Sequence, residues 1–422
     1  MNPYLNFSLE GKVALASLLV MCACSQKQTV TLTVSNNTDL NRVDEMVEVS
    51  MESVAKKLHL VDTAEVVVLD ANGKQLPSQL TSGGNLIFPA TVGANATVSY
   101  TIGVGTPEMV ETSTCGRYYP ERKDDIAWEN DKVIFRAYGP ALQASGERAY
   151  GYDVWVKNVP DLVAEKRYAD DLNPKARAKI AELKDAGKTE EADSLAKAIS
   201  FHVDHGNGMD CYAVGPTLGC GTAALLAADS SIVYPYCYKE YEILDNGPLR
   251  FTVKLVYNPL VVNADSNVVE TRILSLDKGS QLNKAVITYQ NLSAATPVAA
   301  GFVIHPESPE AYKTEAQKGY IAYEDPTENV NNNNGKIYVG AVFPALVNEA
   351  KAVCFSKKER EEQRGGATGH VLAISDYKPG TEYVYYWGSA WSKAGIDSME
   401  KWESYLNEYA HKVRNPLTVT IK

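Results

Sequence analysis

Apolar and polar residues alternate along most of this chain, and that alternation limits the fold more than any other feature. The segment TVTLTVS, residues 29–35, is the clearest example, and MVEVSM, residues 46–51, continues the pattern. A period of two is that of a β-strand with one buried face. Turn signals such as the run from Asp70 to Gly73 separate the alternating segments. The pattern therefore predicts an all-β protein.

The spacing of these strands predicts two domains. Short strands, including residues 65–69, 86–88 and 97–102, fill the first part of the chain up to about Gly105. This spacing is typical of a small β-sandwich, and we assign residues 24–112 to it. It contains no group typical of catalysis, so we interpret it as a support for the rest of the chain.

The longer part of the chain, residues 113–422, contains many long strand-like segments. They predict a large antiparallel two-sheet β-sandwich, or supersandwich. One strongly helical part interrupts it, because Asn173 before Pro174 is a good helix start and the pattern predicts a helical hairpin over 172–200. A C-terminal helix is expected over 398–413, followed by a last strand, LTVTI.

Residues 1–23 are expected to be a lipoprotein signal peptide. Lys12 precedes an apolar run over 13–21, which has the length of a signal-peptide core and is too short to span a bilayer. Small residues then precede Cys24, which we expect to be acylated and to anchor the protein to the membrane. A plain signal peptide without acylation is the alternative. The expected location is the bacterial outer membrane, facing the periplasm or the outside.

Charge and aromatic composition bear on the partner. The formal net charge is −11, and no block rich in Lys or Arg provides the basic surface that nucleic acid needs, so nucleic acid is excluded. The chain has 25 tyrosines and 8 phenylalanines. Tyrosine combines a stacking face with a hydrogen-bonding tip, which suits sugar surfaces as well as half-exposed sheet faces.

Chemically active side chains are densest in residues 201–221, FHVDHGNGMDCYAVGPTLGCG. The glycines in this segment permit positive φ and close backbone approach, so the polar side chains between them can converge on a ligand. We expect His202 and His205 to act as acid and base near neutral pH, with Asp210 fixing a tautomer. Tyr212 would donate to a leaving glycosidic oxygen.

A second segment, residues 121–138, is expected to complete the site. Glu129 with Asp210 forms the carboxylate pair that a hydrolase needs. Arg122 or Arg136 would neutralise the carboxylate of a uronate, which a β-eliminating lyase needs. Further candidate substrate-binding residues are Asp125, Trp128, Tyr138, Trp155, His305, Trp387 and Trp391.

Structural roles are the alternative for each of these residues. A histidine next to valine or glycine is often a core or turn residue with both nitrogens hydrogen-bonded, and tryptophans are more often core residues than sugar platforms. His59, His370 and His411 are expected at the surface. Strand alternation puts His202 and His205 on opposite faces, which disfavours a metal site, so no metal or other cofactor is expected.

The cysteines and calcium leave alternatives open. Five cysteines follow Cys24, an odd number with irregular spacing. Cys211 could bridge Cys220 or Cys237 beside the candidate site, and buried unpaired cysteines are an equal alternative. Calcium through Asp204 and Asp210 is the one metal left open, although no loop signature supports it.

Four ordered blocks resemble one known family. They are DDIAWENDKVIFRAYGPAL, HVDHGNGMDCYAVGPTLGCG, DNGPLRFTVKLVY and the closing YYWGSAW with a later Trp402. They are similar to the domain-of-unknown-function family 4861 of exported lipoproteins from polysaccharide-degrading bacteria. The resemblance implies a β-supersandwich like that of galactose mutarotases and polysaccharide lyases, and a setting in the breakdown of pectin-like or other complex glycans. It implies no mechanism for individual residues.

Together these observations predict an exported lipoprotein that takes a polysaccharide or oligosaccharide as its partner. The expected activity is that of a lyase or hydrolase on uronate-containing, pectin-like sugars, by acid–base chemistry of His and Tyr. A non-catalytic glycan-binding lipoprotein is one alternative. A mutarotase-like or epimerase-like enzyme acting on free sugars is the other.

Overall fold

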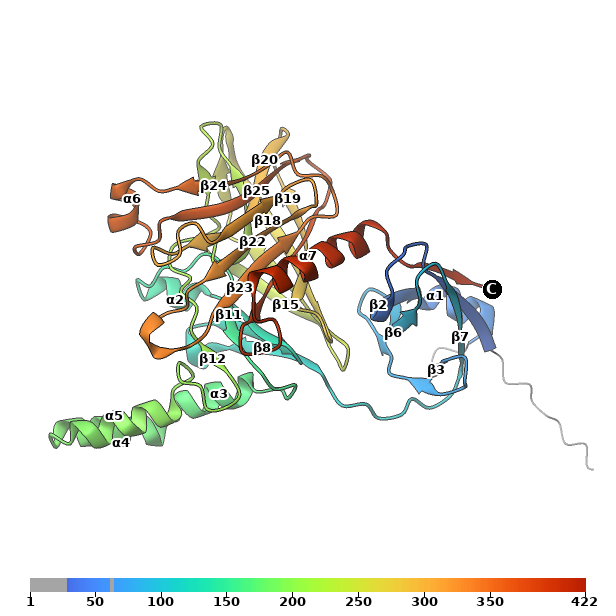
Figure 1. Ribbon diagram of the computed structural model, residues 1–422, viewed down its shortest axis with the longest axis horizontal. Helices are drawn as coiled ribbons and strands as arrows, with labels where there is room; N and C mark the ends of the chain where they lie inside the picture. Colours follow the sequence, from blue (N-terminus) through green and yellow to red (C-terminus); the bar gives the residue numbers. More distant parts are fainter. Residues whose placement is uncertain (1–28, 61–63) are drawn as a thin grey trace, which may run out of the picture.

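The computed structural model describes residues 29–60 and 64–422. Two β bodies, a small one and a large one, lie side by side and are joined by two connections of the chain (Figure 1). The expected signal peptide, residues 1–23, and the expected lipidation site, Cys24, lie outside the described residues. Within the described residues, none of the helices combines the length and the apolar character needed to cross a bilayer.

The small body is a two-sheet sandwich. The inward-facing residues of TVTLTVS, Leu32 and Val34, are fully buried and belong to one core with Phe88 and Ile102. One sheet has the strand order β27-β1-β7-β3-β4 and the other β2-β6-β5. The strands are β1 (Thr29–Ser35), β2 (Arg42–Ser50), β3 (Val66–Leu69), β4 (Gln75–Leu76), β5 (Gln79–Leu80), β6 (Asn85–Val92) and β7 (Thr97–Val104).

The last strand of the chain, β27 (Thr418–Ile421), also belongs to the small body. It pairs antiparallel with β1, with Leu32 opposite Ile421 and Ser35 opposite Thr418. The sequence predicts this strand as part of residues 113–422, because alternation identifies a strand but not its partner strand. The large body is therefore inserted between two strands, β7 and β27, of one sheet.

One layer of the large body is a single antiparallel sheet of nine strands. Its order is β15-β16-β18-β19-β26-β23-β22-β21, and β17 pairs with β18 off this path. The strands are β15 (Tyr238–Asn246), β16 (Arg250–Tyr257), β17 (Leu260–Val262), β18 (Asp265–Asp277), β19 (Leu282–Gln290), β21 (Tyr312–Glu315), β22 (Tyr320–Asp325), β23 (Ile337–Val342) and β26 (Tyr383–Trp391).

The second layer consists of two five-stranded sheets, in the orders β12-β11-β10-β9-β8 and β14-β13-β20-β25-β24. A parallel bridge between Tyr152 and Gly219 joins them. Gly219 has a φ of 55°, and a Cβ there would lie 2.3 Å from the backbone carbonyl oxygen of Tyr152, so only glycine fits. The strands are β8 (Thr114–Tyr119), β9 (Asp125–Asn130), β10 (Val133–Ala137), β11 (Asp153–Val156), β12 (Met209–Asp210), β13 (Cys220–Leu226), β14 (Ile232–Val233), β20 (Thr296–Ile304), β24 (Glu349–Cys354) and β25 (Gly369–Tyr377).

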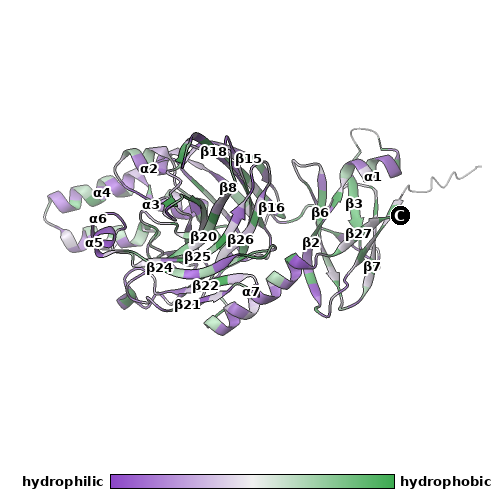
Figure 2. Ribbon diagram, turned by 90° about the horizontal axis from the view of Figure 1, so that it is seen from above, coloured by the Kyte–Doolittle hydropathy of each residue, from purple (hydrophilic) through white to green (hydrophobic). Residues whose placement is uncertain are grey.

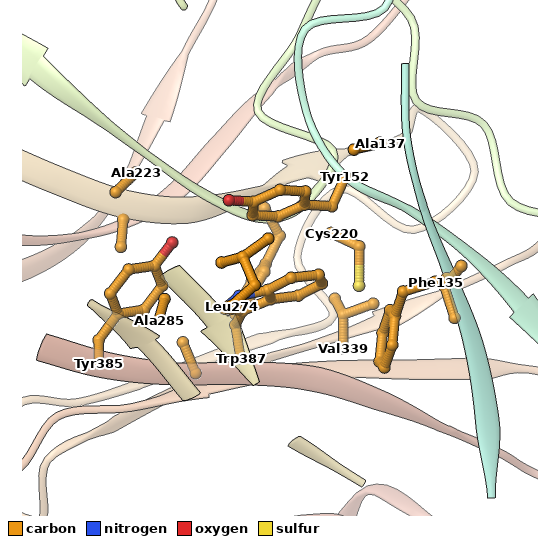
Figure 3. Packing of buried hydrophobic residues seen from close by; sticks show 14 of the residues in the cluster. Phe135, Ala137, Tyr152, Cys220, Ala223, Leu274, Ala285, Val339, Tyr385 and Trp387 are labelled. Carbon is orange, nitrogen blue, oxygen red and sulfur yellow. The ribbon is translucent and has the colours of Figure 1, made fainter. Parts of the chain in front are cut away.

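The core between these layers is rich in aromatic rings. Trp387 of β26 stacks on Tyr152 with the ring centroids 4.1 Å apart, and Phe135 of β10 meets Trp387 edge to face at 4.9 Å. Figure 3 shows these rings around the buried side chain of Cys220. The two layers are thus locked together by large side chains, as expected for a β-supersandwich.

The helices lie outside the two layers. The expected helical hairpin projects away from the sheets (Figure 1), and Asn173 caps its first helix by accepting two backbone hydrogen bonds of 3.1 Å. The C-terminal helix covers the outer face of the nine-stranded sheet, where Trp402 and Leu406 share a core with Tyr338. The helices are α1 (Met51–Leu58), α2 (Pro140–Ala144), α3 (Ala164–Asp171), α4 (Pro174–Asp185), α5 (Thr189–Ile199), α6 (Lys357–Glu362) and α7 (Met399–Arg414), with short 3-10 turns at Pro120–Arg122 and Val330–Asn332.

Gln79 of the small body forms hydrogen bonds with the backbone of residues 249–250 in the large body. Gln79 Oε1 accepts from the backbone nitrogens of Leu249 and Arg250, each at 2.9 Å, and Gln79 Nε2 donates to the Arg250 carbonyl at 3.0 Å. Arg250 also forms an ion pair of 2.6 Å with Glu48 of the small body. Figure 2 shows the small body at the end of the molecule opposite α4 and α5.

Candidate functional site

Residues 201–208 form a turn-rich loop rather than the expected strand. Asp204 Oδ1 accepts from the backbone nitrogens of Gly206 and Gly208, each at 2.9 Å, which folds the loop back on itself. Gly208 has a φ of 99°, and a Cβ there would lie 2.1 Å from the Val156 oxygen. The prediction that the histidines of this segment alternate across a strand is therefore wrong.

His202 and His205 are both exposed. His202 Nδ1 donates to the Asp210 carbonyl at 3.2 Å and lies 3.7 Å from the Asp210 carboxylate. His205 Nε2 donates to the Ser200 carbonyl at 3.1 Å. The structure thus brings His202 and Asp210 together, while the ring of His205 bonds to the backbone of Ser200.

Beneath His202, Arg136 binds three buried carboxylates. Its Nε donates to Asp153 at 2.7 Å, its Nη2 to Asp210 at 3.1 Å, and its Nη1 to Asp125 at 3.5 Å. The Tyr138 hydroxyl accepts a further bond of 3.0 Å from Nη2. All four charged side chains belong to residues that are at most 4 % exposed. The hydrogen bonds of Arg136 are taken by these buried groups, so its predicted contact with a uronate is wrong. Asp125 and Tyr138, also predicted to bind substrate, bond to Arg136 instead.

Burial controls the titration of this cluster. It raises the pKa of Asp125 to about 6 and that of Asp153 to about 6, although the Arg136 charge opposes the shift in both. It also raises the pKa of Asp210. Arg122 is half-buried and adds a second opposing charge at Asp125. Burial outweighs these opposing charges, so Asp125 and Asp153 hold their protons to higher pH than ordinary carboxyls do.

Glu129 has a structural role. Its carboxylate accepts from Lys157 Nζ at 2.8 Å and from the backbone nitrogens of Val163 and Ala164 at 3.0 and 2.8 Å. These last two bonds hold the beginning of α3 against β9. Because Glu129 and Asp210 are both buried in such contacts, the prediction of a catalytic pair at an open groove is wrong.

The aromatic residues predicted to contact sugar are core residues instead. Trp128, Trp155, Trp387 and Trp391 are each at most 2 % exposed, and Trp128 Nε1 donates to Asn283 Oδ1 at 2.8 Å. Tyr212 is buried too, and burial raises its pKa far above the usual range. A proton donor needs access to its substrate, so the predicted roles of these five residues are wrong.

An open pocket of about 520 Å³ lies on the large body. Four loops line it: residues 213–215 after β12, 305–307 after β20, 327–331 after β22, and 364–367 after α6. Helix α6 lies on the side of the large body that faces away from the small body (Figure 1). Loops at strand ends on a rigid scaffold are the usual place for a site.

His305, one of the predicted substrate-binding residues, lies in this pocket. Its Nδ1 lies 2.6 Å from Asp325 Oδ2, and Asp325 is buried at the end of β22, where its other oxygen accepts from the Thr327 backbone at 2.9 Å. Burial disfavours the charged ring. The charge and hydrogen bond of Asp325 outweigh burial and raise the pKa of His305 above its ordinary value.

Glu328, which was not predicted from the sequence, lines the same pocket. Burial raises its pKa, although the charges of His202 and His305 oppose that shift. Glu328 therefore lies within electrostatic reach of both histidines. It sits between Thr327 and Asn329, which have φ values of 66° and 54°. The run DPTEN, residues 325–329, begins at the last residue of β22 and was the signal that could have identified this loop.

Two expectations about other residues also change. His370 is buried, not at the surface, and burial with the nearby Arg364 charge lowers its pKa to about 3, while His59 is exposed and His411 half-buried. Among the described residues all five cysteines are free, and Cys211, Cys220 and Cys237 are buried, so the alternative of buried unpaired cysteines holds rather than a bridge from Cys211. Over the same residues, no three His, Cys, Asp or Glu side chains are grouped so that they could hold a metal ion.

A family model matches residues 34–419, and its description is "Domain of unknown function (DUF4861)". The chain belongs to this family. The DUF4861 match confirms the family to which the four sequence blocks are similar. A curated relative, "Uncharacterized protein P7" from Formosa agariphila, is 26% identical to this chain over 429 residues. The match covers 97% of this chain and 98% of the relative.

Two solved structures from Enterococcus faecalis are similar to the DUF4861 chain. One is an α-mannosidase, with 9% identity and a TM-score of 0.47, covering 94% of this chain and 46% of that chain. The other is a protein of glycosyl hydrolase family 38, with 8% identity and a TM-score of 0.49, covering 94% of this chain and 47% of that chain. The DUF4861 chain thus spans about half the length of these structures, and the likeness is too weak to carry an argument about activity.

Proposed function

We propose that this chain is an enzyme that acts on a glycan by acid–base catalysis in the pocket. The observation that carries the proposal is the 2.6 Å contact between His305 Nδ1 and Asp325 Oδ2 at the pocket wall. A carboxylate in that position orients the ring and supports its protonated form. The pocket volume of about 520 Å³ is typical of sites for small ligands, and a few sugar units are of that size.

His305 and Glu328 take the two proton-transfer roles. His305 acts as general acid, because Asp325 raises its pKa and keeps more of the ring protonated near neutral pH. Glu328 acts as general base, because its raised pKa makes it a better proton acceptor than an ordinary carboxylate. These roles replace those predicted for His205, Tyr212 and Glu129.

The rest of the pocket lining suits hydroxylated ligands. Asn329 and Asn331 line it together with Glu307. A carboxamide both donates and accepts hydrogen bonds, and a carboxylate accepts them, so these groups match sugar hydroxyls.

Elimination and hydrolysis both use an acid and a base, and a panel of pectic and related glycans separates them. A rise in absorbance near ~235 nm marks the unsaturated uronate that a base-driven elimination leaves. New reducing ends without that absorbance mark hydrolysis, and a change of optical rotation with free sugars marks a mutarotase-like reaction. Binding without any of these changes overturns the catalytic proposal in favour of a binding protein.

Variants then test the assignment of roles. We expect His305→Ala and Glu328→Gln each to lower kcat by about 10²- to 10⁴-fold, as is usual for loss of a general acid or base. His205→Ala is the matched control, because His205 is exposed and lies outside the pocket lining. A wild-type rate in His305→Ala contradicts the proposal.

We also propose that the protein is an exported lipoprotein acylated at Cys24, which the apolar run over 13–21 and the small residues after it support. Cys24→Ser should abolish incorporation of labelled palmitate in cells and release the protein from the membrane fraction. Cys22→Ser, two residues away, should change neither. Unchanged labelling of Cys24→Ser contradicts acylation at this residue.

A further inference from the structure

Arg364 in the pocket wall is held in place but has unused hydrogen-bonding capacity. Its guanidinium lies over the Tyr234 ring, 4.1 Å from the centroid, and 5.7 Å from the centroid of Phe355. Its Nη1 donates to the Pro216 carbonyl at 3.1 Å. Its Nε is buried and has no hydrogen-bond partner. Stacking and one backbone bond thus fix the side chain. Nη2 forms no hydrogen bond within the described residues and is not among the buried atoms that lack a partner, so it is the donor open to a ligand.

Arg364 is half-buried and lacks the carboxylate partners that Arg136 and Arg250 have. Arg136 forms ion pairs with three aspartates and Arg250 with two acidic residues. Among the described residues, no carboxylate lies within 4.0 Å of Arg364. The carboxylate of Glu359 interacts with the Arg364 charge from farther away. That carboxylate is exposed and bonded to the Ser356 backbone at 2.9 Å in the cap of α6.

A partly desolvated guanidinium without a counter-ion is unfavourable, and its planar fork matches the oxygens of a carboxylate or sulfate. We infer that Arg364 binds an anionic group carried by the sugar, either the carboxylate of a uronate or a sulfate ester. This inference rests on the proposed function, since it names the class of sugar for the same pocket.

The distribution of charge in the pocket orients such a sugar. Glu328 interacts with His202 and His305, so the proton-transfer groups and their charges are gathered on the loops after β20 and β22. Arg364 lies on a different loop, the one over residues 364–367 after α6. The acidic group therefore binds at the wall of residues 364–367, and the reacting bond lies toward His305.

Binding affinities in the His305→Ala background test this inference without interference from turnover. The probes are a tri-galacturonate, the same trisaccharide with its carboxyls reduced to alcohols, and a sulfated and an unsulfated galactose trisaccharide, measured by titration calorimetry. We expect at least one acidic probe to bind tenfold to a hundredfold more tightly than its neutral counterpart, as is usual for a charge-assisted hydrogen bond. The pair that shows the preference tells carboxylate from sulfate.

Arg364→Gln should reduce this preference to within about threefold while leaving the affinity for the neutral probe unchanged. Arg360→Gln on α6 is the matched control, because it removes the same charge from a residue that does not line the pocket. If Arg364→Gln fails to fold, Arg364→Lys and the salt dependence of wild-type binding take its place, since only an ionic contact weakens as salt rises.

Equal affinities for acidic and neutral probes, or a preference that survives in Arg364→Gln, would overturn the inference. Failure of the proposed function has a different signature, which is wild-type turnover in His305→Ala or turnover of no glycan at all. A protein that prefers acidic sugars but turns none over would keep the Arg364 site and lose only the catalysis.

Discussion

At the residue scale, the contact between His305 and Asp325 predicts a shift in a titration. Asp325→Asn removes the charge that raises the pKa of His305 and leaves the burial that lowers it, so the pKa should fall. The alkaline limb of the pH–rate profile should move to lower pH with it, because the acid must be protonated. Ring resonances followed by NMR across the pH range measure the first shift, and initial rates measure the second.

The same pair affects stability with a definite sign. The folded pKa of His305 is raised above the unfolded value of 6.5, so its stabilising contribution is complete below pH 6.5 and is lost as pH rises through the folded pKa. Asp229→Asn, a change on an exposed loop, should alter neither the titration nor this dependence. If the pKa of His305 is unchanged in Asp325→Asn, Asp325 is not the group that raises it, and the assignment of this pair is wrong.

Burial explains which candidate residues could be predicted from the sequence. His305 could be found, because a histidine at a strand end before Pro306 is placed on a loop by local rules. Glu129 and the tryptophans could not be assigned correctly, since nothing local shows that Lys157 lies against Glu129 or that two sheets close over Trp387. Glu328 and Arg364 were missed because their approach to one pocket depends on the closing of the whole sandwich.

At the element scale, Glu129 ties α3 to the sheet, and its loss should be costly. Glu129→Gln leaves the buried ammonium of Lys157 without its counter-charge, so we expect the free energy of unfolding to fall by about 3 to 5 kcal/mol. Urea denaturation measures this change. Glu165→Gln in the same helix is the control, since that exposed ion pair contributes only about 0 to 1 kcal/mol.

The rate separates this structural role from a catalytic one. For the folded fraction of Glu129→Gln we expect a kcat close to that of the wild type. A rate lowered by more than about a hundredfold in folded protein would restore the catalytic role that the sequence suggested.

The helical hairpin of α4 and α5 should be removable. Only Leu183 in α4 and Ala192 in α5 are buried, so few contacts tie it to the sheets. Replacing residues 174–199 with a short Gly-Ser linker should leave the Tm within a few degrees, about the shift that 1 kcal/mol causes in a large domain. Thermal unfolding and turnover measure the outcome. A tenfold loss of turnover with an unchanged Tm would instead show that the hairpin serves as a lid.

Elements whose signals are local were predicted well. The pattern over 172–200 matches α4 and α5, and 398–413 matches α7, because caps and periodicity lie within these segments themselves. The expected strand at 201–205 failed because Asp204 bonds to two following backbone nitrogens, and that turn outweighs the alternation. Helix α1 was missed although Met51, Val54 and Leu58 follow the helical period, because Met51 also ends the alternating segment 46–51 and was assigned to that strand.

At the scale of the whole molecule, Gln79 couples the two bodies. Gln79→Ala removes three hydrogen bonds and leaves two backbone donors without their partner, so the junction should weaken by about 1 to 3 kcal/mol. We expect calorimetry of the variant to resolve two unfolding transitions, one for each body. In the wild type these two transitions should lie closer together in temperature. Gln75→Ala, on β4 of the small body, is the control, and an unchanged thermogram for Gln79→Ala would contradict the coupling.

The pairing of β27 with β1 has a consequence for synthesis of the chain. The ribosome delivers β1 first and β27 last, so the sheet that they share stays incomplete until nearly the whole chain has emerged. Until then β1 has a bare edge of unsatisfied amides and carbonyls, the kind of edge that recruits foreign strands. A nascent chain that stalls anywhere after β7 keeps that edge, and chaperones or proteases that survey unfinished products have a feature by which to recognise it.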